Sequence, residues 1–198
     1  MKSSLYLWAA WVGSALVAGG WWFYERYTIP PAGRVIWPAV AAYPLVDLAG
    51  QPVRVEALQG KVVLLTFVYT RCASVCPRLS GRLREVLLHT PPEAPLVAVS
   101  LSLDPERDTL GQVEAYLASY SVPGRRWLFW RLPTQKWAFV LAETVFGLAA
   151  ARLDSTNILH TDAIFLIDCE GRLRGSYTSY DENLLLHTQK LLRLCGTD

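Results

Sequence analysis

The sequence predicts an α/β domain, a mixed sheet with helices on both faces, preceded by one transmembrane helix. From residue 45 onward, short apolar runs typical of buried strands alternate with stretches of helical periodicity. The last two predicted strands are separated only by Cys169-Glu170-Gly171, and so short a connection permits only an antiparallel hairpin. A βαβ pattern followed by a hairpin makes the sheet mixed. The third observation is an uncharged apolar stretch from Ser3 to Tyr24.

Composition restricts the function before any motif is considered. Of 198 residues, 52% are hydrophobic and 18% are charged, which excludes intrinsic disorder and collagen-like repetition. Lysine and arginine number 19 against 17 acidic residues, which leaves a formal charge of +2. The chain has no basic block that would neutralise a row of phosphates, so nucleic acid is not an expected partner.

Residues 1–26 are predicted to form an N-terminal membrane anchor. As a helix, the uncharged stretch would be about 33 Å long, close to the hydrocarbon thickness of a bilayer. The alternative is a cleaved signal peptide, with Lys2 as its positive end and Ala18, Gly19 and Gly20 as small residues for cleavage. The stretch exceeds the roughly 7–15 apolar residues of a signal peptide, which favours the anchor. Charge alone does not decide its orientation.

Residues 27–44 are predicted to be a proline-rich linker, and residues 45–198 to be the folded domain. The linker contains four prolines and a single charged residue, Arg34, which is typical of an extended stalk. In the domain, the run from Lys61 to Val68 is apolar almost throughout, as in a central strand buried on both faces. The expected order is a hairpin turning at 49–52, a strand 61–68, a helix 75–88, a strand 96–103, a helix 109–120, a strand 127–132, a helix reaching 150, strands 163–168 and 172–177, and a helix 182–194.

The most informative motif is Cys72-Ala73-Ser74-Val75-Cys76-Pro77, directly after the first strong strand. In a helical turn, a spacing of four places both sulfurs on one face with Cβ atoms about 5–6 Å apart, whereas a disulfide requires about 3.5–4.5 Å. The spacing therefore favours two thiolates that converge on one ion. A helix N-terminus and Arg71 both favour the thiolate form. The alternative is that the two cysteines pack as small apolar side chains.

A two-sulfur site needs another ligand, because no second close pair of Cys or His residues completes a structural zinc site. His160, in a polar loop before the strand at 163–168, is the best of three candidates. His89 ends a helix, and His187 lies in a leucine-rich helix. Two thiolates with one imidazole suit Cu(I), whereas zinc normally asks for a fourth ligand. The alternative is that His160 is simply solvated, as a lone loop histidine often is.

Three blocks resemble, in order and spacing, the signature blocks of the Sco (SenC) family: residues 67–77, 99–109 and 160–171. The resemblance covers Tyr43 to about Leu194. It implies a thioredoxin-like fold and copper, as Cu(I) or Cu(II), bound by Cys72, Cys76 and His160. It further implies assembly of the dinuclear copper centre of cytochrome c oxidase, with the copper-containing oxidase subunit as partner. The domain would then lie on the periplasmic or intermembrane-space side of the membrane, behind a single membrane pass.

The chain departs from the family pattern beside the motif. Ala73 and Ser74 stand where Pro-Asp is usual, which removes a carboxylate from beside the site, and neighbouring groups tune the affinity and redox potential of a metal. Asp104 fits a helix cap, but in the family its segment lies near the metal, so it is also a candidate for the surroundings of the ligands.

Cys169 and Cys195 are candidates for a structural disulfide. An oxidising compartment would permit this bridge and leave Cys72 and Cys76 free. The alternative is that Cys195 packs on the leucine-rich face of the last helix.

The resemblance makes a membrane-anchored copper metallochaperone, delivering copper to the dinuclear centre of cytochrome c oxidase, the leading hypothesis. The alternative is a thiol-disulfide oxidoreductase that reduces the cysteines of the oxidase copper site. In that case Cys72 and Cys76 are catalytic, one attacking and one resolving, and His160 matters much less.

Overall fold

The structure is a computed structural model that describes residues 11, 13–14, 16–20, 28–124, 126–154 and 157–196. The chain divides into two compact units, residues 1–30 and residues 31–198. In the first unit, the described residues between 11 and 20 are helical. Within the described part of the chain, no helix has the length and apolarity needed to cross a membrane. Most of the predicted span, Ser3 to Tyr24, lies outside the described residues.

The second unit is built on a five-stranded sheet with the strand order β3-β2-β1-β6-β7. Strand β1 is parallel to β2 and antiparallel to β6, and β6 and β7 form the antiparallel hairpin. The prediction of a mixed sheet is therefore confirmed. Every residue of β1 is buried, as expected of a central strand. The strands are β1 (Val62–Val68), β2 (Leu96–Ser102), β3 (Arg126–Trp130), β6 (Ile164–Ile167) and β7 (Leu173–Tyr177).

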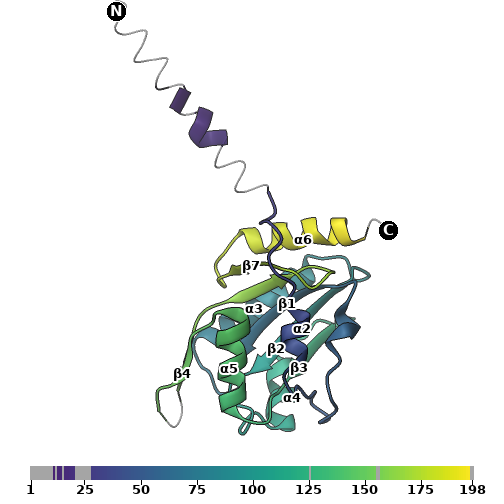
Figure 1. Cartoon of the computed structure of the whole chain (residues 1–198), viewed down its shortest axis with the longest axis vertical. Helices are drawn as coiled ribbons and strands as arrows, with labels where there is room; N and C mark the ends of the chain where they lie inside the picture. Colours follow the sequence, from purple (N-terminus) through teal and green to yellow (C-terminus); the bar gives the residue numbers. More distant parts are fainter. Residues whose placement is uncertain are drawn as a thin grey trace, which may run out of the picture. The chain divides into compact units, whose positions relative to one another are not determined.

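Helices cover both faces of this sheet, and their order along the chain can be followed by colour in Figure 1. Helices α3 and α6 contact each other and β1, while α2 contacts α5. Alternate residues of β1, among them Val63, Leu65 and Phe67, pack into one cluster with the buried residues of α5. The helices are α2 (Trp37–Ala41), α3 (Val75–Leu88), α4 (Leu110–Ala118), α5 (Gln135–Phe146) and α6 (Asn183–Cys195), with a 3-10 turn, η1 (Val55–Leu58).

Part of the predicted linker, residues 27–44, belongs to the fold instead. Val35 forms a bridge with Arg172 beside β7, and Ile36, Trp37 and Val40 are buried. The ring of Trp37 lies so close to Gly171 that a Cβ there would be 2.3 Å from it, and Gly171 has a φ of +80°. Only glycine suits both conditions. The prolines of this segment led to the prediction of a linker, although the segment contains a short apolar helix.

Two further predictions differ from the structure. The helix expected to reach residue 150 ends at Phe146, because Gly147 adopts a left-handed C-cap with a φ of +66°. The chain then forms an unpredicted antiparallel pair, β4 (Ala150–Arg152) and β5 (Ile158–His160), which is separate from the main sheet. His160 therefore ends a strand and does not lie in a polar loop. The predicted hairpin at 49–52 is reduced to an isolated bridge between Val46 and Pro52.

Candidate metal centre

The two cysteines lie where the chain leaves β1 and enters α3. The helix begins at Val75, so Cys76 is in its first turn and Cys72 is in the turn before it. Cys72 lies outside the helix, so the helical spacing considered for the pair does not apply to it. Its sulfur instead accepts a hydrogen bond from the backbone N–H of Cys76 at 3.4 Å. Ser74 makes no side-chain cap, so the Cys72 sulfur satisfies one of the free amides at the helix N-terminus.

His160 reaches the thiols from the end of β5. Its Nε2 lies 3.4 Å from Cys76 Sγ and 3.9 Å from Cys72 Sγ. Among the described residues, these three form the only group of at least three Cys, His, Asp or Glu side chains that could hold a metal ion. Their ligand atoms lie within 4.8 Å of one another, and all three side chains are buried. The structure thus brings together the three residues that were predicted as ligands.

The orientation of the imidazole suits coordination. Nδ1 of His160 lies 3.3 Å from the carbonyl oxygen of Thr161, which can only accept a hydrogen bond. In the neutral ring Nδ1 then carries the proton, and the Nε2 lone pair faces the sulfurs. A backbone partner on the second nitrogen is the usual way in which a protein fixes a ligating histidine.

The two thiols differ electrostatically. A hydrogen bond from the Cys76 side chain, helped by the Cys76 amide, lowers the pKa of Cys72 despite its burial. Burial raises the pKa of Cys76, and the neighbouring Cys72 raises it further. In the metal-free pair, these shifts favour the thiolate form at Cys72 and the protonated form at Cys76. Both cysteines are free in the structure.

Tyr69 is a neighbour of the site that the sequence did not indicate. Its side chain is buried, and its ring meets the His160 ring edge to face, with 5.8 Å between centroids. Its hydroxyl accepts a hydrogen bond from the backbone N–H of Ile158 at 3.4 Å. Burial raises the pKa of Tyr69, so the hydroxyl keeps its proton. The sequence feature that could have indicated Tyr69 is its position three residues before Cys72, at the end of a buried strand.

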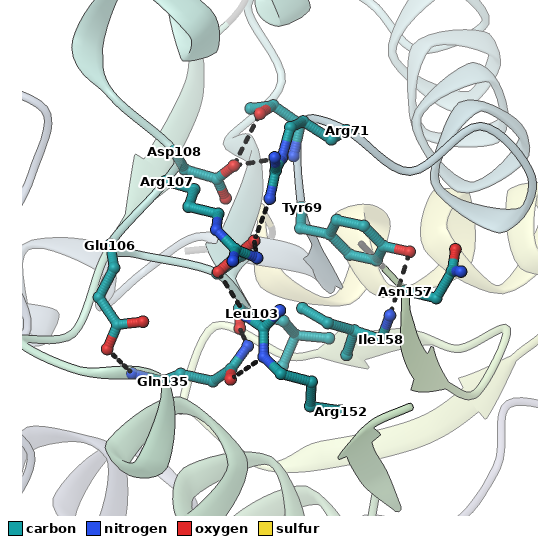
Figure 2. Close-up of polar contacts among 12 residues, drawn as sticks. Tyr69, Arg71, Leu103, Glu106, Arg107, Asp108, Gln135, Arg152, Asn157 and Ile158 are labelled. Atoms are coloured by element: carbon teal, nitrogen blue, oxygen red, sulfur yellow. Dashed lines mark hydrogen bonds and ion pairs between the residues drawn. The ribbon is translucent and has the colours of Figure 1, made fainter. Parts of the chain in front are cut away.

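Asp104 is a buried carboxylate that is only 1% exposed. Its carboxylate accepts hydrogen bonds from Arg152 at 2.8 Å and from Arg71 at 3.2 Å, and Arg107 is 3.6 Å away. Figure 2 shows these arginines converging on one carboxylate. The cap of α4 is made by Thr109, so the capping role considered for Asp104 is wrong. Asp104 is linked to the site through Arg71, the residue before Cys72.

Asp108 is a second buried carboxylate that the sequence did not single out. It accepts hydrogen bonds from the backbone N–H and the hydroxyl of Thr70, at 2.9 and 2.7 Å, and from the Ser102 hydroxyl. Burial raises its pKa. The segment between β2 and α4 therefore holds the two residues before Cys72 by hydrogen bonds. Asp108 binds Thr70, and Asp104 binds Arg71.

The other two cysteines, Cys169 and Cys195, are joined in a disulfide with Cα atoms 5.9 Å apart. The bridge links the β6–β7 turn to the end of α6. The remaining histidines lie elsewhere. His187 is buried against the Tyr177 hydroxyl at 2.8 Å, and His89 is exposed at the end of α3.

A family model described as SCO1/SenC matches residues 38–194 of the chain. The chain belongs to the SCO1/SenC family. This confirms the resemblance that the three sequence blocks indicated.

Known relatives are similar in sequence and fold. The chain is 24% identical over 140 residues to the SCO1 protein homolog of Bacillus subtilis, a match that covers 67% of this chain and 72% of that protein. The structure of Bradyrhizobium japonicum ScoI with copper bound is 26% identical, with a TM-score of 0.61, and covers 84% of this chain and 99% of that one.

A third similar structure is that of BsSco, a member of the Sco family of cytochrome c oxidase assembly proteins in which a disulfide switch is described. It is 20% identical with a TM-score of 0.69, and the match covers 86% of this SCO1/SenC chain and 98% of BsSco. The likeness supports the mixed α/β, thioredoxin-like fold.

Proposed function

We propose that this SCO1/SenC protein is a membrane-anchored copper metallochaperone that delivers copper to the dinuclear copper centre of cytochrome c oxidase. The observation that carries this proposal is the buried convergence of Cys72, Cys76 and His160. Two sulfurs and one imidazole are the ligands that Cu(I) prefers. A site of three ligands also leaves room for an incoming ligand from a partner, so copper can pass by ligand exchange.

The relatives support copper as the cargo. Bradyrhizobium japonicum ScoI is similar over almost its whole length and holds copper, and BsSco belongs to a family of oxidase assembly proteins. We infer the copper-containing oxidase subunit as partner on this ground. The uncharged stretch from Ser3 to Tyr24 supports a single-pass anchor, with the domain on the periplasmic or intermembrane-space side.

A specific observation also favours the second candidate function, a thiol-disulfide oxidoreductase. Cys72 and Cys76 are free, and their pKa values are shifted in opposite directions. A low-pKa thiolate paired with a protonated thiol is typical of an attacking and a resolving cysteine. Cys72 would attack a client disulfide, and Cys76 would then release the client. Two electrons would pass to the client, so this chain would carry a Cys72–Cys76 disulfide and the client two thiols.

One pair of assays separates the two functions. The Cu(I)-loaded full chain is mixed with the metal-free, reduced copper domain of the oxidase subunit, and copper on that domain is measured by mass spectrometry. In parallel, the copper-free reduced chain is mixed with the oxidised domain, and the thiols released are counted. For a chaperone, we expect His160→Ala to abolish or strongly reduce copper transfer, because the third ligand is lost.

The matched control is His89→Ala, which removes an exposed histidine at the opposite end of α3 from Cys76. It should transfer copper like the unmutated chain. If His160→Ala transfers copper normally, the metallochaperone proposal is rejected. Thiol release that survives His160→Ala but not Cys72→Ser would assign the chain to the oxidoreductases.

A further inference from the structure

The thiols and the imidazole reach the site from segments 88 residues apart in the sequence. Cys72 follows β1 of the main sheet, whereas His160 ends β5 of the separate β4–β5 pair. Strand β6 begins four residues after His160 and pairs with β1, with Thr66 opposite Ile164, which brings the two segments near each other. The β4–β5 pair itself is not paired with the main sheet, so the position of Nε2 over the sulfurs also depends on other contacts.

Tyr69 makes one such tie. Its carbonyl oxygen accepts the backbone N–H of Cys72 at 3.1 Å, which fixes it to the thiol loop. Its hydroxyl accepts the backbone N–H of Ile158 at 3.4 Å, which fixes it to β5 two residues before His160. The ring also packs against the imidazole. One residue thus contacts both halves of the site, the thiol loop through its backbone and β5 and His160 through its side chain.

Asp104 makes the other tie, through two arginines. One carboxylate oxygen binds Arg71, the residue before Cys72, and the other binds Arg152, the last residue of β4. Arg152 is fixed a second time, since its Nε donates to Gln135 at 2.6 Å and Gln135 donates to the Leu103 carbonyl at 3.0 Å. Because the Asp104 carboxylate is buried, water cannot replace an arginine partner that it loses, so breaking this tie is costly.

The two ties end on the same rung of the hairpin, because Arg152 and Ile158 are cross-strand partners in the β4–β5 pair. Figure 2 shows the Tyr69 hydroxyl at the backbone of Ile158 and the Arg152 side chain at Gln135. We propose that the Arg152–Ile158 rung, braced by Tyr69 and by Asp104, sets the position of His160 over the thiols, and that Tyr69 and Arg152 are positioning residues of the copper site. This inference rests on the proposed function and names residues outside the three ligands.

The test uses Tyr69→Phe, Arg152→Gln and the double variant in the full chain, purified in detergent. Copper affinity is measured by competition with a chelator of known affinity, and the thiolate-to-Cu(II) absorption band is recorded. We expect each single variant to weaken Cu(II) binding about tenfold, as supports of metal ligands commonly do, and to move the band toward that of His160→Ala. Arg152→Lys, which keeps a positive charge for Asp104, should retain more affinity than Arg152→Gln.

Matched controls come from the same fold. Tyr43→Phe removes a hydroxyl that is hydrogen-bonded to Thr144 at 2.8 Å, and Arg172→Gln removes an arginine that is paired with Glu170. Both should keep the affinity and the absorption band of the unmutated chain. Because the two ties brace one rung, the double variant should differ by more than about twofold from the product of the two single effects.

A second readout needs no copper. Hydrogen exchange of the metal-free chain should show amides 157–160 exchanging faster in Tyr69→Phe and in Arg152→Gln, but not in the controls. Unchanged exchange and affinity in both single variants would overturn the proposal, as would a double variant whose effect is the simple product. If the unmutated chain binds no copper, the proposed function fails. The hydrogen-exchange rates alone then test whether Tyr69 and Arg152 hold the β4–β5 pair in place.

Discussion

At the scale of single residues, the site depends on a sulfur that acts as a helix cap. Cys72 accepts the Cys76 amide, a role usually taken by Ser, Thr, Asp or Asn. The spacing of four was read from the sequence as two positions on one helix face. The two sulfurs do converge, but not through a shared helix face, because Cys72 lies before the start of α3 at Val75, in the loop that Asp104 and Asp108 hold through Arg71 and Thr70.

The unequal thiols lead to a prediction on reactivity. The pKa of Cys72 is lowered, so its thiolate persists as the pH falls below the range in which an ordinary thiol is protonated. With the metal-free, reduced chain, we expect iodoacetamide to label Cys72 before Cys76, at a rate that falls less than about threefold from pH 8 to pH 6. Peptide mass spectrometry at each pH gives the two rates. A rate at Cys72 that drops about tenfold per pH unit, or earlier labelling of Cys76, would contradict the assigned thiolate.

At the scale of elements, apolar runs and helical periodicity identified the main sheet well. The predicted strand 61–68 and helix 75–88 lie within a residue of β1 and α3. The β4–β5 pair was missed, since Ala150–Arg152 is short, half-exposed and has no alternation of apolar residues. Its last residue, Arg152, is held by Gln135 and Asp104, which come from distant segments. Helix α2 was missed because the prolines of its segment indicated a linker, while its buried Trp37 packs against Gly171, which is distant in sequence.

The disulfide provides a prediction at this scale. It closes a loop with a sequence separation of 26 and fastens α6 to the β6–β7 turn. Replacing Cys169 and Cys195 together by Ser should lower the free energy of unfolding by about 3 kcal/mol, because the unfolded chain regains the freedom of that loop. Urea denaturation without reductant measures the loss.

Copper binding by that double variant should be unchanged at temperatures where it is folded, which serves as the internal control. Equal stability of the double variant and the unmutated chain would argue against the bridge. Two free thiols at these positions in non-reducing peptide mapping would do the same.

At the scale of the whole molecule, the sheet topology explains why distant blocks of sequence form one site. Strands β1 and β2 are parallel, so the residues after their carboxyl ends, Cys72 and Asp104 among them, emerge at the same edge of the sheet. The three sequence blocks predicted that Cys72, Cys76 and His160 would form one site, and the structure brings their side chains together. The arginines and Tyr69 that connect those blocks were not predictable, because their partners are set by the fold and not by local spacing.

The most direct test of the account is the copper stoichiometry of the reduced full chain, with its visible spectrum after Cu(I) and then Cu(II) addition. We predict one copper per chain that resists a chelator wash, with thiolate-to-copper bands for Cu(II). Cys72→Ser and Cys76→Ser should lose the copper, and His160→Ala should weaken it and alter the bands. A chain that retains no copper after the wash, or that retains it fully in any of these variants, would contradict the site described above.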